Sequence, residues 1–315
     1  MTENQRVPRK PKALAAGSRL GVFAPASPAD SVEMIAGLAE LKRHGFQVVA
    51  NQDTKAEGYF AGPSLERVNG FLGPATSGHV DGLVALRGGY GSNYLLDFDL
   101  EKSVSTPKCV IGFSDITSLQ IYLWQRCDWV TFYGPMVAAG LSSGNGARGG
   151  YDESSFLQAI GRTDGGWKLR LKGEAVLAGQ SMGRVLGGCL TLVAATIGTP
   201  WELDTQDSIL ILEDRAMKPY QVDRVLMHLK HVGKFAGVRG IILGEFPDSV
   251  PVVPGAPSVR EVCARILRPL GVPIVFGAPV GHTSRAMLTL PLGIKARLDA
   301  DGEGTLEFLE PAVMA

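Results

Sequence analysis

Short apolar runs alternate with amphipathic segments through the first half of the chain. The apolar runs have the length of buried strands and lie at residues 20–24, 46–50, 82–86, 109–113 and 129–132. Between them, apolar residues recur at helical spacing near residues 30–44, 64–72 and 115–125. Strands that alternate with helices in this way predict βαβ units and a parallel sheet.

A stretch rich in glycine and serine, residues 140–150, interrupts this alternation. Beyond it, the pattern predicts helices near residues 186–197 and 219–230 and strands at residues 208–212 and 238–243. Three short strands typical of hairpins follow at residues 288–290, 295–298 and 305–309. We therefore expect an α/β protein with a parallel-sheet domain at residues 1–150, a linker at 151–173 and a mixed second domain at 174–315.

The composition argues against several classes of protein. The 315 residues include 31 lysines and arginines and 31 aspartates and glutamates, so the formal net charge is zero. A neutral chain argues against nonspecific nucleic-acid binding and against an anchor on anionic membranes. The 40 glycines are spread along the chain without a fixed period, which excludes collagen and low-complexity disorder.

The cysteines and the apolar segments indicate a cytoplasmic protein. The cysteines are far apart in the sequence, which argues against CxxC redox motifs and zinc ribbons and is typical of a reducing compartment: Cys109, Cys127, Cys189 and Cys263. The basic N-terminus is not followed by the apolar segment of a signal peptide. Two uncharged runs, residues 129–147 and 185–201, contain glycines and prolines, so we interpret them as a buried strand with its loop and as a buried helix rather than as membrane spans.

The strongest local signal for chemistry is the sequence VIGFSD at residues 110–115. A buried strand reaches a sharp turn at Gly112, and a helix begins directly after it. This context raises the hydroxyl of Ser114 at the carboxyl end of a parallel strand, where open α/β sheets hold their active sites. The helix N-terminus beside it offers backbone N–H groups to an oxyanion. Ser114 is therefore a candidate nucleophile, with a simple helix N-cap as the alternative.

A serine nucleophile needs a base, and the chain has five histidines. His282 follows an apolar strand in a glycine-rich loop that can direct its side chain into a cleft; a surface histidine is the alternative. The other four have simpler interpretations. His44 lies at the end of the first helix, where a cation is favoured, and His79 lies in a loop. His228 and His231 share a helix rich in basic residues, which favours a solvated face over a metal site.

An orienting carboxylate is available where the apolar strand 208–212 ends at Glu213 and Asp214. Either residue would lie beside the expected cleft, and the alternative is a solvated strand terminus. The order of serine, acid and histidine is that of α/β-hydrolases, although the same chemistry occurs on unrelated folds. The glycine-rich loop 87–93 matches neither a dinucleotide nor a P-loop pattern, but its backbone could approach a ligand.

Together these segments resemble the serine LD-carboxypeptidases, the group of muramoyl-tetrapeptide carboxypeptidases and microcin-immunity peptidases. The resemblance extends from about residue 20 to residue 293 and rests on five motifs. They are VFAPASP at 22–28, RGGYG at 87–91, IGFSD at 111–115 with Thr117, ED at 213–214 with PY at 219–220 and DR at 223–224, and GH at 281–282 with TLPLG at 289–293.

The resemblance implies a catalytic triad of Ser114, Glu213 and His282, and so selects the first of the two adjacent carboxylates. The implied reaction cleaves an L-D peptide bond and releases the terminal D-alanine of a murein tetrapeptide, as part of peptidoglycan recycling. It uses no metal and no organic cofactor. The implied fold is a Rossmann-like N-terminal domain with a smaller, β-rich C-terminal domain.

The resemblance also implies substrate contacts from two loops. The backbone N–H groups of Gly89 and Asp115 would form the oxyanion hole, and Gly88 and Tyr90 would contact the substrate. Three positions depart from the family pattern: Cys189 where asparagine is usual, Tyr133 where histidine is frequent, and Met217 where a second acidic residue often follows. We expect none of the three to touch the triad, so they bear on the peptide preference.

Two other functions remain open at this point. Within the same group, the alternative is a microcin-immunity-type peptidase that cleaves peptidyl or aminoacyl nucleotides. Outside it, the alternative is a two-domain protein that closes on a small molecule without chemistry. For the carboxypeptidase we expect a small peptide as substrate, no nucleic-acid or membrane partner, and a homodimer as an open alternative to a monomer.

Overall fold

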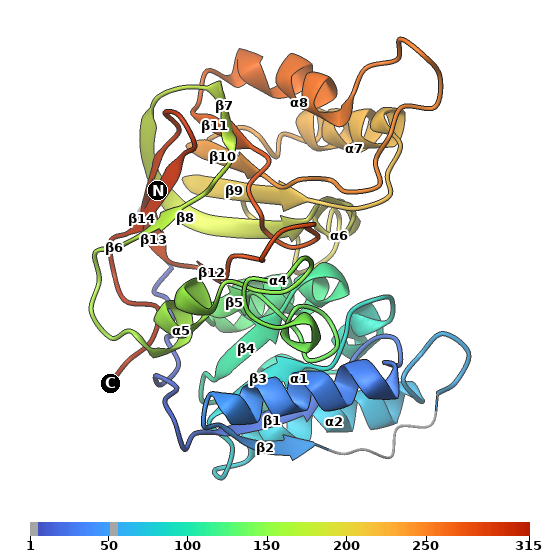
Figure 1. The fold of residues 1–315 in the computed structure, drawn as a ribbon, viewed down its shortest axis with the longest axis vertical. Helices are drawn as coiled ribbons and strands as arrows, with labels where there is room; N and C mark the ends of the chain where they lie inside the picture. The colour runs from blue at the N-terminus through green and yellow to red at the C-terminus, as the bar shows by residue number, and fades with distance from the viewer. Residues whose placement is uncertain (1–5, 51–55) are drawn as a thin grey trace.

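The computed structural model of the protein describes residues 6–50 and 56–315, whose strands form two sheets (Figure 1). The first sheet has six strands in the order β12-β5-β4-β3-β1-β2. They are β1 (Arg19–Phe23), β2 (Gln47–Ala50), β3 (Gly82–Ala85), β4 (Cys109–Gly112), β5 (Thr131–Tyr133) and β12 (Leu290–Leu292). Strands β1 to β5 are parallel in the doubly wound order 2-1-3-4-5, and β12 is an antiparallel edge strand.

The helices of the first half connect these strands. They are α1 (Ser31–Arg43), α2 (Ser64–Thr76), α3 (Leu100–Ser103), α4 (Thr117–Cys127) and α5 (Glu153–Gly161), with short 3₁₀ helices η1 (Ser92–Asp97), η2 (Ser114–Ile116) and η3 (Leu141–Ser143). Local signals set the ends of α1: the side chain of Asp30 accepts the N–H groups of Val32 and Glu33, and Gly45 takes a φ of 82° beyond the last turn. The expected start and end of this helix are confirmed.

The second sheet has eight strands in the order β6-β14-β13-β8-β9-β10-β11-β7. They are β6 (Trp167–Arg170), β7 (Glu174–Leu177), β8 (Gln180–Cys189), β9 (Ser208–Glu213), β10 (Gly240–Leu243), β11 (Ile274–Phe276), β13 (Lys295–Asp299) and β14 (Thr305–Phe308). Strands β8 to β11 are parallel, and antiparallel strands flank them on both sides. The predicted α/β class, with a parallel first sheet and a β-rich mixed second part, is confirmed.

Three helices belong to the second sheet: α6 (Leu190–Ala195), α7 (Pro219–His231) and α8 (Val259–Leu267), the last followed by η4 (Arg268–Leu270). Figure 1 shows α7 and α8 side by side along one face of this sheet, and their apolar side chains share a core with β9 and β10. The expected helix 219–230 is confirmed as α7. Among the described residues, no helix has both the length and the apolar character needed to cross a membrane.

The helix expected at residues 186–197 is wrong over its first four positions. Residues up to Cys189 continue strand β8 and pair with β9, and only Leu190–Ala195 is helical. Gly187 and Gly188 have φ values of 119° and 140°, which an α-helix cannot contain. An added β-carbon on Gly187 would lie 2.1 Å from the carbonyl oxygen of Ile211 on β9. The two glycines therefore permit a close strand pairing that the local apolar pattern does not reveal.

Two further segments differ from the expected hairpins and linker. Strand β12 pairs with β5 of the first sheet, so the chain returns to that sheet near its end, whereas β13 and β14 do form the predicted hairpin. The segment 151–173 contains helix α5 and strand β6, and β6 pairs with β14 in the second sheet. The boundaries of the two domains remain a prediction.

The strands that matter for the site are buried along their whole length. Every residue of β4 and of β9 is buried, as expected for strands covered on both faces. Because β3 and β4 are parallel neighbours, their carboxyl ends meet at one edge of the first sheet. The loops that leave this edge line a cavity together with residues that follow β9 and β11.

Candidate active site

A cavity of about 1100 Å³ lies between the two sheets. From the first half, its walls include the loop after β3 and the turn after β4, with Gly88, Gly89 and Ser114. From the second half, its walls include Asp214 and His282. The residues that the sequence analysis selected for chemistry therefore come together from loops far apart in the chain.

Ser114 stands at the turn between β4 and helix α4, in a conformation that is unusual for its type. Its φ is 61°, in the left-handed region that few non-glycine residues adopt and that is found at functional turns. A serine held in this way after a parallel strand and before a helix has the geometry of a nucleophile elbow. Neither η2 nor α4 has a side-chain capping hydrogen bond, so the interpretation of Ser114 as an N-cap is wrong.

The glycine-rich loop after β3 lies directly against this turn. An added β-carbon on Gly88 would lie 3.0 Å from Cβ and 3.2 Å from Oγ of Ser114, so a glycine lets the loop backbone approach the hydroxyl. Gly89 has a φ of 108°, and Ser27 holds the loop by donating its N–H to the Gly88 carbonyl and accepting the N–H of Tyr90 on Oγ. The loop is therefore fixed beside Ser114 by its neighbour from the β1 loop.

The two N–H groups expected to form the oxyanion hole belong to Gly89, in the loop beside Ser114, and to Asp115, the residue after it. Among the described residues, neither the N–H of Gly89 nor that of Asp115 donates a hydrogen bond to another group. The buried carboxyl of Asp115 accepts the N–H of Ser92 at 2.7 Å and so connects the glycine-rich loop to the turn. Burial raises the pKa of this carboxyl, opposed by its hydrogen bonds from Ser92.

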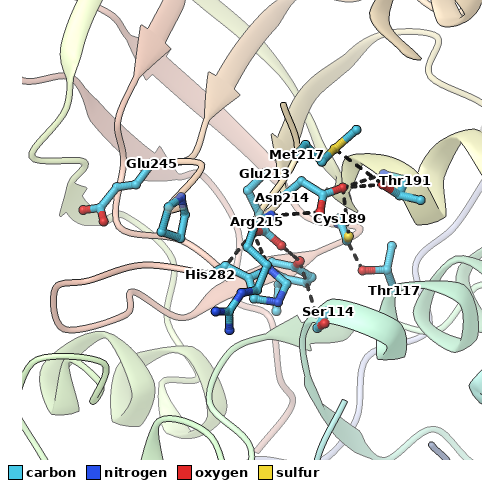
Figure 2. Close-up of polar contacts among 12 residues, drawn as sticks. Ser114, Thr117, Cys189, Thr191, Glu213, Asp214, Arg215, Met217, Glu245 and His282 are labelled. Carbon is cyan, nitrogen blue, oxygen red and sulfur yellow. Dashed lines mark hydrogen bonds and ion pairs between the residues drawn. The ribbon is translucent and has the colours of Figure 1, made fainter. Parts of the chain in front are cut away.

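Glu213 and His282 form a hydrogen-bonded pair in the second half. Glu213 is the last residue of β9 and is fully buried. Its Oε2 accepts both the backbone N–H of His282 and the ring N–H at Nδ1, each at 2.9 Å. Figure 2 shows this pair and Ser114 within one cluster of polar contacts. The bond at Nδ1 leaves Nε2 as the ring nitrogen that can exchange a proton with a substrate or a nucleophile.

The ring of His282 is held from two sides. The ring of Phe113 packs against it edge to face, with centroids 5.2 Å apart, so the residue before Ser114 contacts the imidazole directly. The loop beyond His282 is fixed by Glu245, which accepts the N–H and the hydroxyl of Ser284 at 2.8 and 3.1 Å and pairs with Arg285. The imidazole is therefore positioned by both halves of the protein, with its side chain 13% exposed.

Asp214, the other carboxylate that the sequence left open, points elsewhere. Its Oδ2 accepts the N–H of Thr191 at 3.0 Å, the hydroxyl of Thr191 and the thiol of Cys189 at 3.5 Å (Figure 2). Burial raises the pKa of the Cys189 thiol well above its usual range, so this group stays protonated and donates to the carboxylate. The sulfur of Met217 lies 3.6 Å from the hydroxyl oxygen of Thr191, whose proton goes to Asp214. Of the three departures from the family pattern, Cys189 thus contacts Asp214 and Met217 contacts its partner Thr191.

The third departure, Tyr133, contacts Glu213 of the Glu213–His282 pair, so the expectation that no departure touches the triad is wrong. It is fully buried at the end of β5, and its hydroxyl donates a short hydrogen bond to Oε1 of Glu213. The hydroxyl oxygen of Tyr133 also accepts the N–H of Ser114 at 3.4 Å. The sequence analysis noted Tyr133 only as a departure; its position at the end of the strand beside β4 is the signal that could have placed it at the site.

Other residues considered from the sequence lie away from this centre. The ring of Tyr90 packs with Tyr59, Phe60 and Tyr94 in a partly exposed aromatic group, and Tyr90 is not among the residues that line the cavity. The side chain of His44 is buried against Tyr151, and this burial lowers the pKa of its imidazole although the end of a helix favours a cation.

Within residues 6–50 and 56–315, no group of three or more His, Cys, Asp or Glu residues is arranged to hold a metal ion.

The fold and the cavity define an α/β protein in which Ser114 and His282 line one cavity between two sheets, with His282 hydrogen-bonded to Glu213. The sequence profile of the LD-carboxypeptidase N-terminal domain matches residues 20–134, and that of the LD-carboxypeptidase C-terminal domain matches residues 182–298. The chain belongs to the LD-carboxypeptidase family. A relative of Bacillus subtilis named "Probable murein peptide carboxypeptidase" is 34% identical over 254 residues, 77% of this chain and 76% of its own length.

Solved structures of two relatives share the fold. The microcin C7 self-immunity protein MccF superposes with a TM-score of 0.87 at 25% identity, over 97% of this chain and 100% of MccF. A muramoyltetrapeptide carboxypeptidase from Oxalobacter formigenes superposes with a TM-score of 0.81 at 27% identity, over 93% of this chain and 99% of its own. MccF has also been solved in complex with aspartyl sulfamoyl adenosine. The chain is therefore similar both to proteins named for murein peptides and to one named for self-immunity to microcin C7.

Proposed function

We propose that this protein is a serine LD-carboxypeptidase that releases the terminal D-alanine from murein tetrapeptides during peptidoglycan recycling in the cytoplasm. The observation that carries the proposal is that Ser114, in its strained turn, lines the same cavity as His282, which is hydrogen-bonded to Glu213. Membership of the LD-carboxypeptidase family and the similarity to proteins named for murein peptides support the choice of substrate.

In the proposed acylation step, Oγ of Ser114 attacks the carbonyl carbon of the L-D peptide bond. Nε2 of His282 accepts the hydroxyl proton, and Glu213 stabilises the imidazolium through the hydrogen bond at Nδ1. The carbonyl oxygen becomes an oxyanion, which the N–H groups of Gly89 and Asp115 stabilise. When the tetrahedral intermediate collapses, the C–N bond breaks and the imidazolium gives its proton to the leaving amine, so D-alanine is released.

In the proposed deacylation step, a water molecule takes the place of the amine. His282 removes a proton from the water as it attacks the acyl-serine ester, and the same two N–H groups stabilise the second oxyanion. Collapse of this intermediate breaks the bond to Oγ, and His282 returns the proton to Ser114. The products are the shortened peptide and the free enzyme, and no cofactor enters either step.

A carboxypeptidase must bind the free carboxylate at the end of its substrate, and the cavity has cations for this. Arg87, Arg148 and Arg215 line it. Arg87 donates to the carbonyl of Pro28 at 2.9 Å, and Arg215 pairs with Asp248 at 3.0 Å. Arg148, on the glycine-rich loop before α5, makes no hydrogen bond or ion pair with any other described residue. It is the cation we propose to bind the carboxylate of the terminal D-alanine.

The alternative is cleavage of peptidyl or aminoacyl nucleotides, which the fold similarity to MccF supports. One experiment separates the two. The purified protein is incubated with murein tetrapeptide and, separately, with a peptidyl nucleotide, and the products are identified by mass spectrometry. Loss of one alanine from the tetrapeptide, and no loss from a peptide that ends in L-alanine, is the expected result. Cleavage of the nucleotide alone supports the alternative, and cleavage of neither contradicts both.

A further inference from the structure

Tyr133 connects the two halves of the site at a single atom. Its hydroxyl donates to Glu213 on the second sheet and accepts the N–H of Ser114 on the first. We propose that Tyr133 is a positioning residue that fixes the carboxylate of Glu213 relative to the nucleophile turn. This inference rests on the proposed catalytic triad, and it concerns a residue that the family resemblance does not assign to the site.

The carboxylate of Glu213 depends on Tyr133 for one of its two oxygens. Oε2 is occupied by the two N–H groups of His282, whereas Oε1 has the Tyr133 hydroxyl as its hydrogen-bond donor within the described chain. Both Glu213 and Tyr133 are fully buried, so water cannot readily replace this donor. A buried carboxylate oxygen without a hydrogen-bond partner is costly. The bond from Tyr133 therefore favours the one orientation of the carboxylate in which Oε2 also binds His282.

The protonation of the phenol sets the direction of this hydrogen bond. Burial, followed by the nearby charge of Glu213, raises the pKa of Tyr133 well above its usual range. The phenol is therefore neutral at physiological pH and donates its proton to the carboxylate. The lone pairs of the same oxygen remain available to the N–H of Ser114.

Tyr133 is itself held rigidly. It pairs with Gly112 across β4 and β5, two residues before Ser114. Its ring lies edge to face with Phe113 at 6.4 Å, and an added β-carbon on Gly188 would come within 3.1 Å of its Cε2. The hydroxyl therefore has one position relative to the turn, and Glu213 is oriented by the first sheet although it belongs to the second.

The test compares two buried tyrosines whose hydroxyls each donate to a glutamate. Tyr133→Phe removes the hydrogen-bond donor to Glu213. Tyr151→Phe removes the donor to Glu40, a hydrogen bond of 2.7 Å that does not involve the triad. We expect Tyr133→Phe to lower kcat about 10- to 100-fold, as loss of a supporting group does at other sites, with KM within about twofold of wild type. Tyr151→Phe should leave both constants unchanged. Equal effects of the two variants, or an unchanged kcat in Tyr133→Phe, would overturn the inference.

A double variant tests whether Tyr133 acts through Glu213. In Glu213→Gln the carboxylate is absent, so adding Tyr133→Phe should lower kcat by no more than about threefold further. If the two losses multiply instead, Tyr133 does not act through Glu213. The comparison of Glu213→Gln with the double variant also decides the matter if Tyr133→Phe alone fails to fold, because both of those proteins lack the buried negative charge.

A serine-directed fluorophosphonate separates this inference from the choice of substrate. The rate at which it labels Ser114 depends on the activated nucleophile and not on a murein peptide. If the wild-type protein is labelled but does not cleave the tetrapeptide, the proposed substrate is wrong, and slower labelling of Tyr133→Phe than of Tyr151→Phe still supports the role of Tyr133. Equal labelling rates overturn it. A wild-type protein that is neither active nor labelled overturns both.

Discussion

The carboxylate of Glu213 lies directly against the α-carbon of Gly281, the residue before the candidate base. An added β-carbon at this glycine would lie 2.3 Å from Cδ and 2.4 Å from Oε1 of Glu213. Gly244, beyond β10, is similarly close, because its added β-carbon would lie 2.4 Å from Cβ of Glu213. The buried acid therefore occupies space that two glycines leave free, and Gly281 brings the backbone N–H of His282 onto Oε2.

Gly281→Ala should lower both stability and activity, because it displaces the carboxylate. The added methyl meets Glu213, and the φ of 62° adds strain of about 1–2 kcal/mol for any L-residue. Gly271→Ala is the matched control, since its φ is 69° and no atom lies within 4 Å of the added carbon. We expect the control to lose only the stability that corresponds to this backbone strain, measured by chemical denaturation, and to keep its kcat/KM. A similar kcat/KM in both variants would show that Gly281 does not matter for positioning Glu213.

Ser114→Ala should abolish turnover and leave the fold and substrate binding largely intact. Removal of the nucleophile from a serine hydrolase commonly costs on the order of 10⁴–10⁶ in rate. Ser142→Ala is a suitable control, because Ser142 also lines the cavity but lies on a different loop. Cleavage rates measured by mass spectrometry test the loss of turnover, and tetrapeptide affinity measured by calorimetry tests the retained binding. A folded Ser114→Ala protein with near-normal activity would show that Ser114 is not the nucleophile.

Some of this site follows from local sequence because the determining interactions are local. A buried four-residue strand that ends at Gly112, a turn at Ser114 and a helix from Thr117 raise the side chain of Ser114 wherever the strand lies in the sheet. The choice between Glu213 and Asp214 does not follow from local sequence, because both stand at the same strand end. It depends on the loop carrying His282, which is 69 residues away from Glu213 in the chain.

The predictions that are wrong also involve contacts between residues far apart in the chain. Residues up to Cys189 look helical by their apolar content, but pairing with β9 extends them into a strand. Likewise, Leu290–Leu292 joins β5 instead of its neighbours in sequence. Tyr133 reaches Glu213 across 80 positions, so its place at the end of β5 could indicate the site but not this partner. The family resemblance supplies part of this information, but not for a position where the chain departs from its pattern.

Glu213→Gln should be less damaging than His282→Ala. The imidazole transfers the proton in both steps, whereas the carboxylate orients and stabilises it without taking the proton. By analogy with other triads, we expect losses in kcat on the order of 10⁶ for His282→Ala and 10⁴ for Glu213→Gln. Steady-state kinetics of both folded variants on the same peptide provide the comparison. The reverse order would contradict the assigned roles.

The stability of the protein should fall in mild acid because of His44. Burial, followed by the charge of Arg43, lowers the pKa of this imidazole from 6.5. The folded state therefore binds the proton less readily than the unfolded chain. The free energy of unfolding keeps its full value above about pH 6.5 and decreases as the pH falls through the folded pKa of His44. In His44→Gln the loss between about pH 7.5 and pH 5 should be smaller, as measured by urea denaturation. His79→Gln, at an exposed histidine, should behave like wild type; equal pH dependence in all three proteins would contradict this account.

Arg148→Gln should raise KM for the tetrapeptide more than it lowers kcat. If this guanidinium binds the terminal carboxylate, its loss removes an interaction present in both the bound substrate and the transition state, which is the pattern of uniform binding. A hydrogen bond to a charged group contributes about 1.5–3 kcal/mol, so KM should rise about 10- to 150-fold. Arg148→Lys keeps the charge but not the planar pair of donors, so its KM should lie between those of wild type and Arg148→Gln.

A substrate with a C-terminal amide shows whether Arg148 recognises the carboxylate itself. Wild type should strongly prefer the free acid to the amide, and Arg148→Gln should treat the two nearly alike, because neither then meets a cation at that position. Arg87→Gln is the control, since Arg87 also lines the cavity but is bonded to the Pro28 carbonyl. If Arg87→Gln loses the preference and Arg148→Gln retains it, the carboxylate binds at the loop after β3 instead, and the proposed role of Arg148 is wrong.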